Sequence, residues 1–298
     1  MGTPEFAVAS LKAILDAGGN VVAVVTAPDK PAGRGMQLKM SAVKEFALAQ
    51  GLLVLQPEKL RAPEFIEQLK AFNPSLNVVV AFRMLPEIVW NLPPLGSINL
   101  HGSLLPQYRG AAPINRAIMN GETQTGVTTF RLSRQIDTGN ILDSETIDVP
   151  FEETAGELHN RMMHIGANLL VKTLKGIADG SISEKPQTFS SDQKHAPKIH
   201  SADCEINWNR NAMEIYNLIR GLSPFPGSFT HLNGKKLKIL SAGYSNRLLP
   251  LPPGSFDTDR KSYLTFACAE GHINVKTLQL EGKKIMEVAD FLRGYHFI

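Results

Sequence analysis

Three polar side chains at two-residue spacing follow an apolar stretch in the first half of the chain. In "SINLHGSLLPQYRGAAPIN" (97–115), Asn99, His101 and Ser103 occupy alternate positions. Because an extended chain turns alternate side chains to one face, a strand here would present an amide, an imidazole and a hydroxyl together. An amide and a protonated imidazole on one face can both donate hydrogen bonds to an oxygen that gains negative charge during a reaction.

A second motif supplies an acid, because "QIDTGNIL" (135–142) places Asp137 before a Thr-Gly pair. A carboxylate beside an imidazole orients the ring and favours its charged form. The combination predicts acyl transfer to an amine, in which Asn99 and protonated His101 stabilise the tetrahedral oxygen while Asp137 orients His101 and helps to remove the amine proton. No Ser or Cys stands as an evident covalent nucleophile, which favours direct transfer. The alternative is that Asn99 caps a turn and His101 is a structural histidine.

The segments that must position these side chains alternate between strand and helix patterns. Short β-branched runs predict strands at 21–27, 52–57, 76–82 and 96–101, and helical apolar spacing predicts helices at 5–19, 41–51, 62–73 and 86–92. This alternation predicts an α/β domain with a doubly wound parallel sheet and right-handed crossovers. Ligands of such sheets bind beyond the carboxyl ends of the strands, which is where strand 96–101 would place Asn99 and His101.

The second half of the chain has a different pattern of predicted helices and strands. After a predicted helix at 111–121 and strands at 125–133 and 139–149, a long amphipathic helix (154–180) begins with Thr154 and Glu157 at capping-box positions. A polar stretch then leads to a helix (211–222) and several short strands separated by turns, which predicts a small antiparallel barrel or sandwich. We therefore expect a first domain at 1–185, a linker at 186–202 and a second domain at 203–298.

Composition excludes several classes of protein. With 298 residues, 43% hydrophobic and 20% charged, the chain is globular rather than disordered, and it has no run of ~20 apolar residues. Cys204 and Cys268 are far apart, which favours a reducing compartment, and no metal site is expected, since His159 and His164 lack the H-E-x-x-H spacing. Residues 1–186 carry 17 Lys/Arg and 18 Asp/Glu, whereas residues 187–298 carry 14 and 10. The basic second part indicates a polyanionic partner.

The two polar motifs together carry a family resemblance. "NLHGSLLPQYRGAAPINRAI" and "IDTGNIL", in this order, strongly resemble the formyltransferases that use 10-formyltetrahydrofolate. The resemblance implies a Rossmann-like N-terminal domain, an OB-like C-terminal β-barrel, and Asn99, His101 and Asp137 as the catalytic residues. It also implies a folate site without a metal, formed by Ser103, Leu104, Leu105, Pro106, Arg83 and Leu85.

The opening "GTPEFAVASL" and the loop 26–44 are similar to the branch of this family that formylates methionyl-tRNA for translation initiation. This implies initiator methionyl-tRNA as partner, a bacterial cytoplasm or organellar matrix, and a monomer. In the loop, Lys30, Arg34 and Lys39 outnumber Asp29, and such cations can bind phosphate. The alternative is a mobile surface loop whose charges only aid solubility.

Two features depart from the family pattern. A short apolar strand usually precedes the Gly-Thr-Pro turn, but here only Met1 does. Each buried large apolar side chain contributes roughly 1.5–3 kcal/mol, so we expect either a start assigned at an internal Met, which we favour, or a sheet with a slot. Restoring some five to ten upstream residues should then raise soluble yield and melting temperature. The second departure is Phe82-Arg83 in place of Tyr-Gly, where Arg83 either lowers folate affinity or points to solvent.

Two other functions stay open at this point. A formyltransferase that acts on a small amine, such as a sugar nucleotide, would need neither the basic loop nor the basic second domain. A noncatalytic RNA-binding homologue would keep the basic surfaces and lack turnover.

Overall fold

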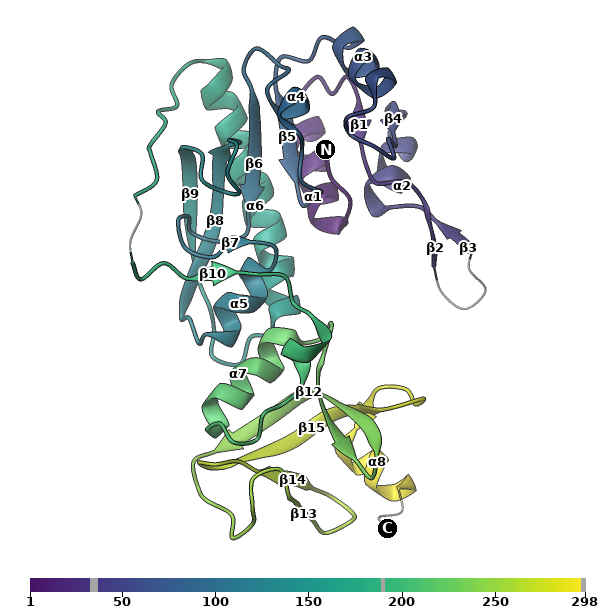
Figure 1. Ribbon diagram of the computed structural model, residues 1–298, viewed down its shortest axis with the longest axis vertical. Coiled ribbons are helices and arrows are strands. Elements are labelled where there is room, and N and C mark those ends of the chain that lie inside the picture. Colours follow the sequence, from purple (N-terminus) through teal and green to yellow (C-terminus); the bar gives the residue numbers. More distant parts are fainter. Residues whose placement is uncertain (33–36, 189–190, 296–298) are drawn as a thin grey trace. The chain divides into compact units, whose positions relative to one another are not determined.

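The computed structural model describes the chain except for residues 33–36, 189–190 and 296–298 (Figure 1). Arg34, one of the predicted tRNA contacts, lies outside the described residues. The chain forms two compact units, each assembled from separated segments. The first unit comprises Met1–Gly110, Gly126–Ile147 and His159–His195, and the second comprises Ala111–Thr125, Asp148–Leu158 and Ala196–Ile298. The domain limits expected from the sequence stay a prediction.

The first unit is built on a four-stranded sheet in the order β5 (Asn77–Val80), β6 (Ser97–His101), β8 (Gln124–Arg131) and β9 (Ile141–Asp148). Strands β5 and β6 are parallel, whereas β8 runs antiparallel to β6. Apolar residues of β6 such as Ile98 and Leu100 are almost fully buried, as the β-branched and leucine-rich pattern of these strands requires. The four predicted strands in this sheet are confirmed.

A second, parallel pair of strands, β1 (Val24–Val25) and β4 (Val54–Leu55), lies on the other side of the N-terminus. Helices α1 (Glu5–Asp16), α2 (Ala42–Ala49), α3 (Pro63–Ala71) and α4 (Glu87–Trp90) alternate with these strands along the chain. The apolar faces of α3 and α4 share a core with β1 and β5, formed by Val25, Leu60, Phe65, Ile66, Leu69, Val79, Leu85 and Val89. The predicted α/β class with parallel strands is therefore confirmed.

The N-terminal residues lie between the two sheets of the first unit. The Gly2 N–H donates to the Val25 carbonyl of β1 at 3.0 Å, and Gly2 also forms a parallel bridge with Val80 of β5. Beyond them, β2 (Lys30–Ala32) and β3 (Gln37–Lys39) form an antiparallel hairpin at the position of the basic loop (Figure 1).

Helix α6 (Ala155–Ala178) starts at the capping box that the sequence predicts. The Thr154 hydroxyl accepts a hydrogen bond from the Glu157 N–H, and the Glu157 carboxylate accepts from the Thr154 N–H at 2.9 Å. These hydrogen bonds hold the pKa of Glu157 below its ordinary value of 4.5. None of the helices in the described part of the chain is long and apolar enough to cross a membrane.

The second unit contains an antiparallel sheet in the order β11 (Ser228–Leu232), β12 (Lys235–Ser245), β15 (His272–Leu280), β14 (Leu264–Ala267) and β13 (Phe256–Thr258), with β16 (Met286–Glu287) also paired to β15. The sheet curls into a half-barrel, which agrees with the predicted antiparallel second domain (Figure 1). The other elements of this unit are α5 (Pro113–Met119), a 3₁₀ turn (Ser201–Cys204), α7 (Ala212–Leu222) and α8 (Val288–Gly294). Helix α7 packs its buried face, including Ile215 and Ile219, against the core of the sheet.

Candidate active site

Asn99 and His101 lie on β6, two residues apart, as the sequence predicts. In the sheet register Asn99 is opposite Val79 on one side and Phe130 on the other, and His101 is opposite Thr128. His101 is only 7% exposed, whereas Asn99 is partly exposed. Among the described residues, the Asn99 amide has no hydrogen-bond partner, so its N–H groups can serve a bound molecule.

The contacts of His101 distinguish the roles of its two ring nitrogens. Nε2 lies 2.9 Å from the backbone carbonyl of Tyr108, and since a carbonyl can only accept, Nε2 carries a proton. Nδ1 faces the carboxylate of Asp137, with 3.8 Å between Nδ1 and Oδ2. The edge of the ring packs on Phe130, with the two centroids 6.3 Å apart. Nδ1 is therefore the nitrogen that can exchange a proton beside the acid.

Asp137 comes from the loop between β8 and β9, so the structure brings the two distant polar motifs together. Its Oδ2 atom accepts a hydrogen bond from the Gly110 N–H at 2.9 Å, at the end of β7 (Arg109–Gly110). Its backbone has a φ of 54°, in the left-handed region, and Tyr108 has a φ of 59°. Strained backbone of this kind persists only where surrounding contacts hold it, and it is frequent at functional sites.

A residue that sequence reasoning missed, Gln187, holds the Asp137 loop. Its amide nitrogen donates to the carbonyls of Asp137 at 3.0 Å and Gly139 at 2.7 Å, and its oxygen accepts from Arg109 Nε at 3.1 Å. Gln187 and Arg109 are both 7% exposed. Burial lowers the pKa of the Arg109 guanidinium, and the nearby charge of Asp137 opposes that shift. Gln187 lies in the polar stretch after α6, where no periodicity marks a buried side chain.

The "GSLLP" segment (102–106) forms a turn that buried hydrogen bonds stabilise. The Ser103 hydroxyl donates to the Gln107 carbonyl at 2.6 Å, and the Thr128 hydroxyl donates to the Ser103 carbonyl at 2.7 Å. The same Thr128 oxygen accepts from the Leu105 N–H at 3.1 Å. Ser103 is fully buried, so its hydroxyl stabilises the turn and does not face outward beside Asn99.

The remaining residues of the expected folate site adjoin this turn or the loop after β5. Leu104 is partly exposed and packs over Gly126, while the Pro106 carbonyl accepts a hydrogen bond from the Gln193 amide. Leu85 is 8% exposed and belongs to the core between the helices and β5. The role of these residues in folate binding stays a prediction.

Arg83 does not extend freely into solvent. Its guanidinium donates to the carbonyl of Glu58 at 2.8 Å and to that of Pro57, and it lies 5.5 Å from the centre of the Phe82 ring. Its Nε is buried and lacks a hydrogen-bond partner within the described structure. Arg83 therefore ties the loop after β5, which contains Ala81 at a φ of 46°, to the segment after β4.

The β2/β3 hairpin carries two of the three predicted phosphate contacts. Lys30 and Lys39 are exposed and face each other in the register of the two strands. Asp29 at the base of the hairpin binds Lys44 at 2.5 Å and Gln56 at 2.8 Å, and these contacts lower the pKa of Asp29. Because Asp29 is already paired with Lys44, its negative charge does not offset the positive charges of Lys30 and Lys39.

Two protein-family models match this chain, one in its N-terminal part and one in its C-terminal part. Residues 1–174 match the model described as "Formyl transferase", and residues 198–296 match "Formyl transferase, C-terminal domain". The chain therefore belongs to the formyl transferase family.

Within this family, methionyl-tRNA formyltransferases of several bacteria are similar to this chain. That of Bacteroides fragilis is 45% identical over 304 residues, which cover 99% of this chain and 94% of the relative. Those of Parabacteroides distasonis and Phocaeicola vulgatus are 48% and 49% identical over 305 residues, with the same coverage.

Two solved structures share the fold at lower identity. A sugar 3N-formyl transferase, WlaRD, has a TM-score of 0.68 at 22% identity, with 95% of this chain and 97% of the other covered. An N-formyltransferase from Helicobacter canadensis has a TM-score of 0.65 at 21% identity, covering 92% and 96%. At these identities the likeness concerns the fold alone.

Proposed function

We propose that the chain is a methionyl-tRNA formyltransferase, which transfers the formyl group of 10-formyltetrahydrofolate to the amino group of initiator methionyl-tRNA. The observation that carries the proposal is the 3.8 Å approach of His101 Nδ1 to the Asp137 carboxylate, next to Asn99. Near-full-length identity of 45–49% to methionyl-tRNA formyltransferases supports this acceptor.

The reaction needs one bond to form, one to break, and one proton to move. The amine of the acceptor attacks the formyl carbon, and the carbonyl oxygen becomes an oxyanion in the tetrahedral intermediate. Asn99 donates an N–H to this oxygen, and protonated His101 contributes positive charge beside it. The Asp137 carboxylate, beside protonated His101, takes the amine proton, and the bond from the formyl carbon to the folate nitrogen then breaks as that nitrogen accepts this proton.

The surrounding backbone prepares this geometry before substrate arrives. The Tyr108 carbonyl holds Nε2 of His101, so Nδ1 is directed at Asp137, and the Gly110 N–H holds the carboxylate. Burial of the ring excludes water and strengthens its interaction with the acid. Little reorganisation is then needed when charge develops, which is the main source of electrostatic catalysis.

We place the folate donor against the turn 103–106 and the loop of residues 81–85. The internal bracing of Ser103, Leu105 and Pro106 gives a rigid backbone there, and Leu104 adds a partly exposed apolar surface. Arg83 and Leu85 support the folate site indirectly, because they hold the loop after β5 in place. A flat heterocycle suits a site of this kind, in which apolar surface is combined with fixed backbone polar groups.

We place the tRNA contacts on the β2/β3 hairpin and on the basic C-terminal part of the chain, residues 187–298. Lys30 and Lys39 are exposed, and the excess of Lys and Arg after residue 187 supplies further charge for phosphates. The chemistry belongs in the compartment where protein synthesis starts, the bacterial cytoplasm or an organellar matrix, and one chain provides both the transfer site and the RNA surfaces.

Incubation with 10-formyltetrahydrofolate and one of two acceptors tests the proposal. We expect formylated methionyl-tRNA as product and no product on an amino-sugar nucleotide. Product only on the sugar nucleotide would favour the small-amine alternative, which the likeness to sugar formyl transferases makes the relevant competitor. Binding of tRNA without turnover would favour the noncatalytic RNA-binding alternative.

A further inference from the structure

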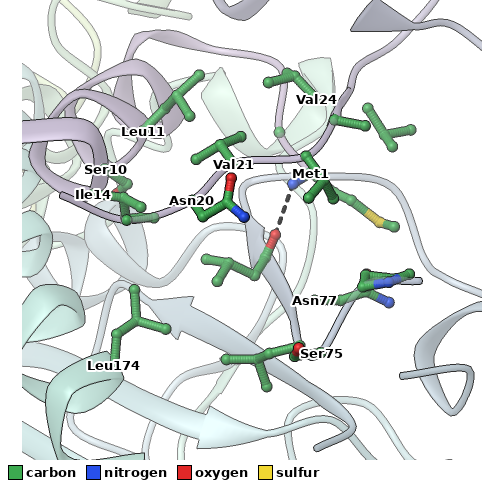
Figure 2. Close-up of a pocket in the computed structure, with 18 of the residues that line it drawn as sticks. Met1, Ser10, Leu11, Ile14, Asn20, Val21, Val24, Ser75, Asn77 and Leu174 are labelled. Carbon is green, nitrogen blue, oxygen red and sulfur yellow. Dashed lines mark hydrogen bonds between the residues drawn. The ribbon is translucent and has the colours of Figure 1, made fainter. Parts of the chain in front are cut away.

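The catalytic residues lie outside a cavity between β1 and β5, and backbone groups hold them in place. This cavity has a volume of about 510 Å³ and is lined by apolar side chains such as Leu11 and Leu174 (Figure 2). Asn99, His101 and Asp137 are not among the residues that line it. The His101 ring is held by a backbone carbonyl, and the Asp137 carboxylate by a backbone N–H. The conformation of that backbone therefore decides whether the pair is aligned.

Tyr108 supplies the carbonyl, and its own backbone is held by a second segment. Its carbonyl accepts a hydrogen bond from Nε2 of His101 at 2.9 Å, and its N–H donates to the Lys194 carbonyl at 2.7 Å. Tyr108 is 4% exposed and has a φ of 59°, a left-handed conformation that a residue other than glycine keeps only where its surroundings enforce it. The contact with Lys194 is therefore part of what directs the carbonyl at His101.

Two glutamine side chains hold the same two segments together. The Gln193 side-chain amide donates to the Pro106 carbonyl, and the Lys194 N–H donates to Oε1 of Gln107 at 2.8 Å. Each glutamine thus binds the backbone of the opposite segment, 87 residues away in the sequence. Together with the bond from Tyr108, three consecutive residues are bound to two. We call the pair of Gln107 and Gln193 the glutamine clasp.

The glutamine clasp connects the donor side of the transfer site with the acid side. On the donor side, the Gln107 carbonyl accepts from the Ser103 hydroxyl at 2.6 Å and the Gln107 N–H donates to the Leu104 carbonyl at 3.0 Å. Gln107 therefore belongs to the turn against which we place the folate. On the acid side, Gln187, which precedes Gln193 in the same stretch of chain, donates to the Asp137 carbonyl. One stretch of chain thus contacts both the donor turn and the loop of the acid.

We propose that Gln107 and Gln193 are positioning residues for the transfer reaction, which act on His101 through the backbone of Tyr108. When the clasp is opened, Tyr108 is free to leave its disfavoured conformation, and its carbonyl then turns away from Nε2. The ring loses its fixed orientation toward Asp137, so it must reorganise before it can stabilise the oxyanion. The inference rests on the proposed function for the reaction, whereas the hold on the ring can be measured without substrate.

The test uses Gln107→Leu and Gln193→Leu, singly and together, in the full chain. Two quantities are measured: kcat for formylation of methionyl-tRNA, and the Nε2–H signal of His101 in protein labelled with ¹⁵N-histidine, assigned by its absence in His101→Ala. We expect kcat to fall by about 10-fold in each single variant, with KM for methionyl-tRNA within about twofold. The double variant should lose little more than the singles, because both side chains act on one link. The His101 signal should weaken through faster exchange with water.

Two controls keep the interpretation specific. Gln107→Glu keeps an acceptor oxygen for the Lys194 N–H and should recover most of the rate and of the His101 signal. Gln279→Leu removes an exposed hydrogen bond from a side-chain amide to the Lys283 carbonyl, in the C-terminal sheet, and should change neither.

The outcomes separate the glutamine clasp from the proposed function. Near-normal kcat in both single variants, with a lower Tm, would overturn the positioning role and leave the clasp as a support of the fold. A lower kcat with an unchanged His101 signal would overturn the action through Tyr108. A parent chain that does not formylate methionyl-tRNA would remove the proposed function, and an unchanged signal in the leucine variants would then overturn the clasp separately.

Discussion

At the scale of single residues, one backbone carbonyl decides which nitrogen of His101 can react. The Tyr108 carbonyl accepts a hydrogen bond from Nε2–H, so Nδ1 is the nitrogen that faces Asp137. The variant Asp137→Asn keeps an acceptor for the Gly110 N–H but removes the charge beside the ring. We expect kcat to fall by about 10²-fold or more, with melting temperature little changed, as measured by initial rates of tRNA formylation.

Asn99→Ala and His101→Ala should reduce the rate on the same scale, because they remove the oxyanion donor and the positive charge beside the oxyanion respectively. Ser103→Ala serves as the comparison, because its hydroxyl braces the turn and does not face the reaction. A near-normal rate in Asp137→Asn would remove the acid from the mechanism and leave the assignment to rest on Asn99 and His101.

Gln187 is expected to act through Asp137 as a positioning residue. The variant Gln187→Leu is similar in size but cannot make the hydrogen bonds to the carbonyls of Asp137 and Gly139 and leaves Arg109 without that acceptor. We expect kcat to fall by about 10-fold while KM for methionyl-tRNA stays within about twofold, since supporting hydrogen bonds of this kind typically change activity by 10–100-fold. Gln187→Glu, which keeps the acceptor for Arg109, should recover part of the rate.

The matched control for this prediction is Gln279→Leu, which removes a similar exposed hydrogen bond from a side-chain amide to the Lys283 carbonyl, in the C-terminal sheet. An unchanged pH–rate profile together with a fall in stability would assign Gln187 a structural role only. A displaced profile at constant stability would support its action on the His101–Asp137 pair.

The residues of this site differ in how far the sequence predicts them. Asn99, His101 and Asp137 can be predicted, because alternation along a strand and a second polar motif identify chemically capable side chains. The brace at Tyr108 cannot, because any residue type can supply a carbonyl. Ser103 shares the strand spacing, but its hydroxyl bonds to Gln107 once the chain turns, and that turn depends on backbone geometry.

At the scale of elements, the start of α6 is the clearest local signal in the sequence. The reciprocal hydrogen bonds of Thr154 and Glu157 satisfy N–H groups at the start of the helix. The variant Thr154→Ala should destabilise the protein by about 1 kcal/mol, which corresponds to roughly 2–4 °C in Tm. The measurement is thermal unfolding at pH 7, with Ser183→Ala as control, because Ser183 is exposed and its side chain makes no hydrogen bond within the described structure.

The difference in Tm between the parent chain and Thr154→Ala should depend on pH in one direction only. Because hydrogen bonds from Thr154 lower the pKa of Glu157 in the folded chain, ionised Glu157 stabilises the fold above its ordinary pKa of 4.5. That stabilisation disappears as the pH falls through the lower, folded-state value. The gap in Tm between the parent and Thr154→Ala should therefore narrow below about pH 4, and a gap that widens there would contradict the capping role.

Helices and strands can be predicted from the sequence where a regular hydrophobic period coincides with capping residues. They cannot be predicted where neither signal is present. Helix α7, expected at 211–222, begins at an Asn211–Glu214 capping box and spans Ala212–Leu222. The β2/β3 hairpin is recognisable in the sequence only as a basic loop, because Pro31 and the flanking glycines break any strand pattern. Gln187 falls in the predicted linker for the same reason, since its burial arises from contacts with distant segments.

At the scale of the whole molecule, the net charge of +3 is divided unevenly along the sequence, since residues 1–186 carry −1 and residues 187–298 carry +4. Total charge alone does not distinguish RNA binding from solubility. The distinction lies in whether individual cations release counterions on binding, which the salt dependence of tRNA affinity measures.

The salt dependence of tRNA affinity separates RNA contacts from general surface charge. Lys30→Ala with Lys39→Ala should lower the slope of log K for tRNA against log salt concentration by about 2, one for each phosphate that a lysine no longer neutralises. The control is Lys12→Ala with Lys70→Ala, which removes the same charge from lysines that are paired with Asp16 and Glu67 on helix surfaces. Equal changes of slope in the two pairs would mean that the hairpin acts only through net charge. A lower slope confined to the hairpin pair, with kcat at saturating tRNA unchanged, would place the hairpin lysines on the RNA backbone and outside the transfer chemistry.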